Sequence, residues 1–248
     1  MAGKEPRELR VIRTERITTN MHRVTLGGEG MLGFPEDSEG GYVKLKLTKT
    51  NNESPITRTF SVRFQRQNEI DIDFVLHGDG GPASRWALDC QEGEAIMIGG
   101  PGPKTLVDHK ADWVLLIGDM TALPAISVNI ERLPTNAVGY VVMEVIDESD
   151  IQTLPVPVGV KVKWLVNAKP GENTKLLSDY VRNLTWLEGS PSVWVACEFN
   201  CMKNLRDYLR IERQLNKDNL YISSYWKHGS NEDGHRDAKR ADKTTVTS

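Results

Sequence analysis

The fold of this chain is decided by the stretch His77-Gly78-Asp79-Gly80-Gly81-Pro82-Ala83-Ser84-Arg85-Trp86-Ala87, read together with Arg58-Thr59-Phe60-Ser61 upstream. A strand pattern over Glu69–Leu76 runs directly into the glycine cluster, and Pro82 then takes the first position of a short predicted helix. Glycines let the backbone approach a ligand closely, and the free amides of a helix N-terminus bind anions. The stretch therefore predicts a phosphate-binding turn between a strand and a helix.

The composition is that of a globular protein, with 39% hydrophobic residues, 26% charged residues and a formal net charge of −3. This balance indicates neither nucleic acid nor an anionic membrane as a partner. No apolar run reaches the roughly 20 residues of a membrane span, and the segment Met1–Arg10 lacks the features of a secretory signal. We therefore expect a cytoplasmic protein. The three cysteines and five histidines lack metal-ligand spacing, so we predict no metal held by the protein itself.

The first part of the chain, residues 1–107, reads as short strands punctuated by glycine-rich turns. Six such strands with one helical insert predict a small antiparallel barrel. The predicted strands are Arg10–Ile17, His22–Leu26, Tyr42–Leu47, Arg58–Phe64, Glu69–Leu76 and Glu94–Ile98.

The second part, residues 108–226, alternates strands with helices and predicts a parallel, doubly wound sheet. Its first strand, Val114–Ile117, is a continuous apolar run, as expected of a strand covered on both faces. Residues 227–248 form a polar C-terminal segment, in which Glu232–Lys243 is either a solvated helix or a disordered tail. The further predicted strands are Tyr140–Val145, Val162–Val166, Val193–Ala196 and Leu220–Ser223, and the predicted helices are Ala122–Leu133, Thr174–Leu184 and Met202–Gln214.

The stretches 58–61 and 77–87 resemble the flavin-binding half of the ferredoxin-NADP reductase superfamily. Within that superfamily, their residues resemble those of the siderophore-interacting proteins. Two later motifs resemble the same family. One is Gly118-Asp119-Met120-Thr121-Ala122-Leu123-Pro124-Ala125-Ile126, in which Met120 replaces a usual glutamate, and the other is Tyr225-Trp226-Lys227-His228-Gly229. Cys197 stands where the family has a glycine. The resemblance runs from about Arg10 to Glu232, and it implies an FAD-binding barrel domain over 1–107 and an NAD(P)H-binding type of domain over 108–226.

The resemblance also implies which residues form the sites. Arg58 is expected to meet the FAD pyrophosphate, Phe60 to lie against the flavin ring, and Ser61 with its backbone to lie near the flavin N5. No side chain is expected to be catalytic, because the flavin is the redox centre. The other expected cofactor-binding residues are Thr59, His77, Gly81, Ala83, Ser84, Thr121, Tyr225 and Trp226, with Tyr225 or Trp226 covering the flavin face. The expected siderophore contacts are Lys44, Lys104 and Lys227.

The family's activity implies a soluble flavoprotein oxidoreductase of iron uptake and iron homeostasis that reduces the Fe(III) of ferric siderophores to Fe(II), releasing intracellular iron. The electron donor is NADH, NADPH or a reduced ferredoxin, and Glu144, at a strand end, would favour NADH if it bonded a ribose. A general NAD(P)H flavin reductase and a siderophore carrier without enzymatic activity remain alternatives. We expect a monomer whose partner is the ferric siderophore.

Overall fold

The computed structural model describes residues 5–47, 56–76 and 81–246 of the chain. The predicted site residue His77 and the glycines Gly78 and Gly80 lie outside the described residues. The chain forms two compact units, which we call the barrel unit (Met1–Thr105) and the parallel-sheet unit (Leu106–Ser248).

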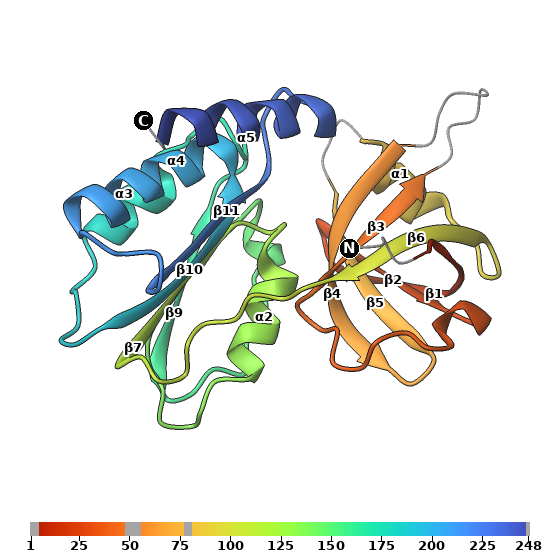
Figure 1. The fold of residues 1–248 in the computed structure, drawn as a ribbon, viewed down its shortest axis with the longest axis horizontal. Coiled ribbons are helices and arrows are strands. Elements are labelled where there is room, and N and C mark those ends of the chain that lie inside the picture. Colours follow the sequence, from red (N-terminus) through yellow and green to blue (C-terminus); the bar gives the residue numbers. More distant parts are fainter. Residues whose placement is uncertain (1–4, 48–55, 77–80, 247–248) are drawn as a thin grey trace. The chain divides into compact units, whose positions relative to one another are not determined.

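The barrel unit confirms the predicted antiparallel barrel: it is closed and has the strand order β1-β2-β5-β4-β3-β6 (Figure 1). Strand β3 shows how the sequence sets the inner face, because the buried Val43 and Leu45 alternate with the exposed Lys44 and Lys46. The strands are β1 (Arg7–Thr18), β2 (Met21–Gly27), β3 (Tyr42–Leu47), β4 (Ile56–Arg66), β5 (Glu69–Val75) and β6 (Ala95–Gly102), with a 3₁₀ turn at Glu29–Met31.

Helix α1 (Pro82–Asp89) packs on the barrel core. Ala87 is buried in that core, and the Trp86 ring lies 5.7 Å from the ring of Phe74. The Trp86 indole also donates a hydrogen bond to the Glu94 carboxylate at 2.9 Å. These contacts fix the helix on the barrel and so fix the position of its N-terminus.

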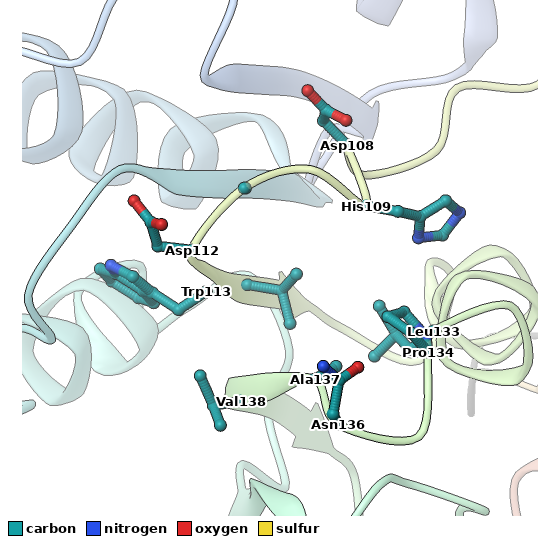
Figure 2. Close-up of a pocket in the computed structure, with 11 residues that line it drawn as sticks. Asp108, His109, Asp112, Trp113, Leu133, Pro134, Asn136, Ala137 and Val138 are labelled. Atoms are coloured by element: carbon teal, nitrogen blue, oxygen red, sulfur yellow. The ribbon is translucent and has the colours of Figure 1, made fainter.

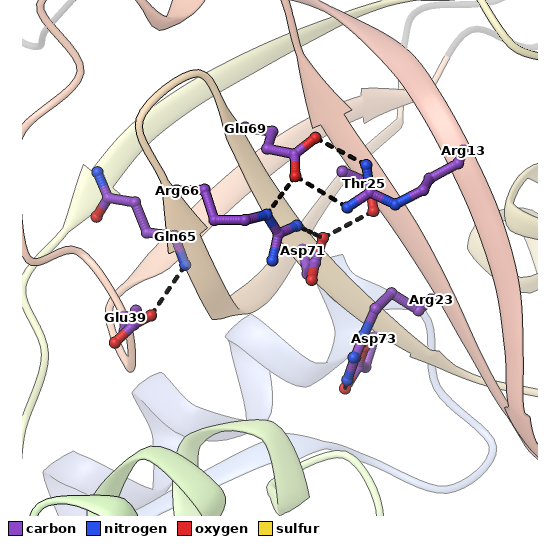
Figure 3. Close-up of polar contacts among 9 residues, drawn as sticks. All are labelled: Arg13, Arg23, Thr25, Glu39, Gln65, Arg66, Glu69, Asp71 and Asp73. Carbon is purple, nitrogen blue, oxygen red and sulfur yellow. Dashed lines mark hydrogen bonds and ion pairs between the residues drawn. The ribbon is translucent and has the colours of Figure 1, made fainter.

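A network of charged side chains ties strands β1, β2, β4 and β5 together on the barrel wall (Figure 3). Arg13 forms two hydrogen bonds with the Glu69 carboxylate, at 2.8 and 2.9 Å, and Arg66 also pairs with Glu69. These partners lower the pKa of Glu69 to about 2, the Arg13 hydrogen bond contributing most. Arg23 pairs in the same way with Asp73.

The parallel-sheet unit contains a five-stranded sheet in the order β11-β10-β7-β8-β9, and all its neighbouring strands are parallel. Strand β7 is buried along its whole length, as its continuous apolar run predicts. The predicted doubly wound fold is therefore confirmed. The strands are β7 (Trp113–Gly118), β8 (Val138–Val145), β9 (Gly159–Val166), β10 (Pro191–Glu198) and β11 (Leu220–Trp226), with a 3₁₀ turn at Glu148–Asp150.

Helices cover both faces of this sheet (Figure 1). Helix α2 (Leu123–Glu131) lies on one face, and α3 (Leu176–Arg182) and α4 (Phe199–Asp207) lie on the other, where Leu177 and Leu205 join the core. Helix α4 continues into a π-helical turn at Tyr208–Glu212. Among the described residues, no helix is long and apolar enough to cross a membrane.

The C-terminal segment, for which the sequence left helix and disorder open, forms helix α5 (Glu232–Val246). Polar contacts attach it to the unit. The buried His235 shares a 2.8 Å hydrogen bond with the Ser224 hydroxyl of β11, and Asp242 pairs with Arg206 of α4.

Candidate functional site

The N-terminus of α1 has the features of an anion site. Gly81 is its N-cap, and within the described ranges no side chain caps the helix. Because Pro82 has no N–H and Arg85 is the first residue to bond back to Gly81, the amides of Ala83 and Ser84 are free of helix partners. A Cβ on Gly81 would meet no described atom within 4 Å, so this backbone faces open space. The buried Ser84 hydroxyl donates to the Val75 carbonyl at 2.9 Å and so holds the helix start on β5.

Strand β4 divides its predicted site residues between two faces. Arg58 and Phe60 stand opposite the buried Leu45 and Val43 of β3, so they share the inner face. Both are half-buried, and the Phe60 ring lies 4.4 Å from that of Phe74, which leaves part of Phe60 accessible.

Thr59 and Ser61 occupy the outer face of β4, and their backbone groups point away from β3. Val62 bonds toward the β3 side, donating to the Gly41 carbonyl at 2.8 Å. Since hydrogen bonding alternates along an antiparallel pair, Thr59 and Ser61 direct their amides and carbonyls to the other side. Along the described residues, pairing with β5 begins only at Val62 and Ile72. The backbone of Thr59 and Ser61 is therefore available to a flat, hydrogen-bonding ligand.

Two exposed lysines stand on the outer face of the barrel beside this edge. Lys44 pairs in register with Thr59, and Lys46 pairs with Thr57. Lys44 is a siderophore contact predicted from the sequence, and the alternation along β3 places Lys46, which was not predicted, on the same face. We call Lys44, Lys46, Thr57 and Thr59 the lysine–threonine face.

The two other predicted lysines lie in different environments. Lys104 forms an ion pair with the Asp37 carboxylate at 2.5 Å and donates to the Asp37 carbonyl at 2.7 Å, so its charge is largely compensated. Lys227 belongs to the parallel-sheet unit, where its ammonium lies 5.9 Å from the centre of the Phe199 ring.

In the parallel-sheet unit, the turn after β7 brings α2 very close to the sheet. A Cβ on Gly118 would lie 2.7 Å from Ile126 and 3.0 Å from the Ala196 carbonyl, so only glycine fits there. Asp119 follows at the carboxyl end of β7. Ligands of open parallel sheets bind in the crevice at this edge.

Asp119 joins three strand ends through its buried carboxylate. One oxygen accepts hydrogen bonds from the Thr121 amide at 2.9 Å and hydroxyl at 2.5 Å. The other accepts from the Glu198 amide of β10 at 2.9 Å and from the Trp226 indole of β11 at 2.8 Å. Burial raises the pKa of Asp119, and the hydrogen bonds from Thr121 and Trp226 oppose that rise.

Glu198 and Glu144 complete a row of carboxylates along this edge. Glu198 caps α4 by accepting from the amides of Asn200 and Cys201, and its other oxygen accepts from the His228 amide at 3.1 Å. Glu144, at the end of β8, is 6% exposed and accepts from the Asn167 side chain at 2.9 Å. Burial, together with the negative charges of Asp119 and Glu198, raises the pKa of Glu144 to about 7.

The structure separates the two aromatic candidates at the end of β11. Trp226 directs its indole N–H to Asp119 at the crevice edge. Tyr225 instead packs edge-on against Trp194 of β10, with ring centres 6.3 Å apart. Cys197 is fully buried in the core, where burial raises the pKa of its thiol well above the ordinary value. Met120 is buried as well, so neither replacement adds an exposed group to the crevice.

A cavity of about 110 Å³ lies at the opposite edge of the same sheet (Figure 2). Trp113 and Val138, which begin β7 and β8, line it together with His109 and Pro134. Since nucleotide ligands of parallel sheets bind at the carboxyl edge, this cavity does not belong to the candidate site. Over the described part of the chain, no group of three or more potential ligands can hold a metal ion.

Comparisons with known proteins agree with this fold. Residues 111–229 match the family model described as siderophore-interacting protein, and residues 10–55 and 47–105 match that of the siderophore-interacting FAD-binding domain. The ferric vibriobactin reductase of Vibrio cholerae is 35% identical over 94% of each chain. The NADPH-dependent ferric-chelate reductase of Escherichia coli is 25% identical over 89% of this chain and 92% of that protein. The siderophore-interacting protein of Aeromonas hydrophila superposes with a TM-score of 0.86, at 32% identity over 95% of this chain and 97% of its own.

Proposed function

This chain belongs to the siderophore-interacting protein family, and from that membership we propose that it is an FAD-dependent reductase of ferric siderophores. The proposal is carried by two features of the unit that matches the FAD-binding domain. One is the N-terminus of α1, which has no side-chain cap, and the other is the backbone of Thr59 and Ser61 on β4, which does not pair with β5 along the described residues. The first feature suits a pyrophosphate and the second suits the polar edge of a flavin ring.

The residues of the barrel unit fit FAD. The amides of Ala83 and Ser84 would hold the phosphates, with Arg58 as their cation. The accessible part of Phe60 would offer an aromatic surface to the ring, and the backbone of Ser61 would supply hydrogen bonds to its polar edge. Phenylalanine carries no hydroxyl, so this contact with the ring is apolar.

When bound, FAD takes electron pairs from a nicotinamide and delivers single electrons to iron. The hard oxygen donors of a siderophore hold Fe(III) far more tightly than Fe(II), so reduction weakens the complex. Here the iron is cargo brought by the substrate. We propose that the protein's part is to bind and orient FAD and the ferric siderophore, without a catalytic side chain.

We place the ferric siderophore against the lysine–threonine face. Lys44 and Lys46 offer two positive charges about two residues apart on one strand, and Thr57 and Thr59 offer hydroxyls opposite them. Anionic ferric siderophores suit this surface. Lys104 contributes less, because Asp37 neutralises it.

We assign the electron donor to the carboxyl edge of the parallel-sheet unit, where Trp226, Thr121 and Glu144 lie. NADH or NADPH is the proposed donor, and reduced ferredoxin is the alternative. The buried Glu144, already bonded to Asn167, gives little support to direct recognition of a ribose. We propose that a monomer carries out this reaction in the cytoplasm, where the three buried, free thiols stay reduced.

The proposal is tested by anaerobic absorbance after gel filtration of the FAD-loaded protein. Flavin that stays with the protein, and that bleaches with NADH, NADPH or reduced ferredoxin, supports the reductase and identifies its donor. A general flavin reductase would lose its flavin on the column and would reduce ferric siderophores only with free flavin present. A carrier would show no bleaching with any donor. Either result would contradict the proposal.

A further inference from the structure

The buried carboxylate of Asp119 is more extensively bonded than a crossover turn requires. A turn of this kind needs only the two bonds from Thr121, which stabilise its own backbone. The second oxygen instead accepts hydrogen bonds from residues distant in sequence. These donors are the amide of Glu198, 79 positions away, and the indole of Trp226, 107 positions away. All four partners are donors, so the site is built for an ionised carboxylate.

The neighbouring carboxylates oppose that ionised form, whereas the hydrogen-bond donors favour it. Asp119 shares its edge with the carboxylates of Glu144 and Glu198, and three negative charges there would repel one another. Among the described residues, Asp119 accepts from four donors, whereas Glu144 accepts from the Asn167 side chain. The pKa of Glu144 is raised to about 7, so this neighbour is partly protonated near neutral pH and repels the Asp119 carboxylate less than a fully ionised carboxyl would.

The backbone that carries Trp226 is also held by a second set of contacts, which come from helix α5. Ser224, two residues earlier, shares a hydrogen bond with His235, and its carbonyl accepts from the Lys239 ammonium at 2.9 Å. Helix α5 therefore fixes the strand, while Asp119 fixes the indole at the end of it. Because both its backbone and its indole are fixed, the Trp226 ring forms a rigid surface at the carboxyl edge of the sheet.

We propose that Asp119 is a positioning residue that fixes the Trp226 indole at the carboxyl edge of the sheet, as a wall against which the nicotinamide donor is oriented. This inference rests on the proposed function, in which a nicotinamide enters that edge. Asp119 acts through Trp226, and it needs no contact with the donor.

Two substitutions test the pair, alone and together, in the FAD-loaded protein. Trp226→Phe keeps an aromatic ring and removes the indole donor. Asp119→Asn keeps the size of the side chain but leaves one side without an acceptor, because an amide has a single carbonyl oxygen. Trp164→Phe removes an indole from β9, the strand farthest from β11 in the sheet order, and serves as the matched control. If Asp119→Asn does not fold, Trp226→Phe still tests the contact.

The first readout is structural and does not depend on activity. In ¹H–¹⁵N spectra, the indole signal of Trp226 is identified by its loss in Trp226→Phe. We expect this signal to shift upfield and to lose protection from solvent exchange in Asp119→Asn, whereas Trp164→Phe leaves it in place. An unchanged Trp226 signal in Asp119→Asn would overturn the proposal.

The second readout is the reduction of bound flavin by NADH and NADPH under single-turnover conditions. Each substitution is expected to weaken the apparent affinity for the donor about tenfold, and the double variant to be no worse than either single one. Effects that multiply in the double variant would show that the residues act separately, and would refute the pairing. If no nicotinamide reduces even the unmodified protein, the proposed donor fails, and the indole signal alone decides whether Asp119 fixes Trp226.

Discussion

Replacing Glu144 with glutamine is expected to remove a pH-dependent cost to the stability of the parallel-sheet unit. Glu144 of β8 lies next to Asp119, which follows the neighbouring strand β7, and Glu198 of β10 lies beyond Asp119. Glu144 is 6% exposed. Glutamine keeps the size of the side chain and a carbonyl that accepts from Asn167, but it carries no charge.

The magnitude follows from the difference in proton binding between the folded and unfolded chains. The pKa of Glu144 is raised from 4.5 to about 7, so between these values the folded protein keeps a proton that the unfolded chain has released. The free energy of unfolding therefore falls as the pH rises through this interval and stays low above it. At about 1.4 kcal/mol per unit of pKa, the full loss is about 3 kcal/mol.

The measurement is urea unfolding between pH 4.5 and 8, followed by tryptophan fluorescence. Trp86 is the one tryptophan of the six that lies in the barrel unit, so the signal reports mainly the parallel-sheet unit. Glu144→Gln should match the unmodified protein near pH 4.5 and exceed it by about 3 kcal/mol at pH 8. The exposed Glu188→Gln is the matched control and should show no such divergence. Parallel pH profiles for Glu144→Gln and the unmodified protein would refute the reasoning.

Three further predictions concern the barrel unit. Gly81→Val should leave the thermal stability of the flavin-free protein unchanged, because the backbone is extended there and the side chain meets open space. The same substitution should weaken FAD binding at least tenfold in a fluorescence titration. Normal affinity for FAD would count against the phosphate site. The double substitution Lys44→Glu and Lys46→Glu should raise the KM for an anionic ferric siderophore about tenfold, and added salt should reduce this effect. The exposed control Lys217→Glu should leave that KM unchanged. Glu69→Gln should lower the free energy of unfolding by about 1 kcal/mol above pH 4.5. This difference should shrink toward pH 2, because Glu69 of the unmodified protein is protonated there. A difference independent of pH would contradict the lowered pKa of Glu69.

The fold followed from local sequence because its elements carry strong local patterns. The alternation of Val43 and Leu45 with lysines identified a strand with one buried face, and the uninterrupted run Val114–Ile117 identified a strand covered on both faces. Helix α5 was not decided by the sequence. Its attachment depends on polar partners such as Ser224 and Arg206, which hydrophobic periodicity does not detect.

The candidate site was less predictable, because its geometry depends on contacts between distant residues. The bond from Trp226 to Asp119 joins positions 107 residues apart, and the pairing of Lys104 with Asp37 spans 67. Family resemblance supplied the expected site residues, but it gave no reason to choose Trp226 over Tyr225. The choice depends on which ring faces the strand ends, and that is a property of the folded sheet.

The central claim, that this chain passes electrons from bound flavin to siderophore iron, is tested most directly by one anaerobic measurement. The FAD-loaded protein is reduced chemically, so that the identity of the natural donor does not matter, and is then mixed with a ferric siderophore and a chelator of Fe(II). We predict that the flavin absorbance recovers as Fe(II) accumulates, with about two Fe(II) trapped for each flavin oxidised. Flavin that stays reduced in the presence of the ferric siderophore would contradict the account.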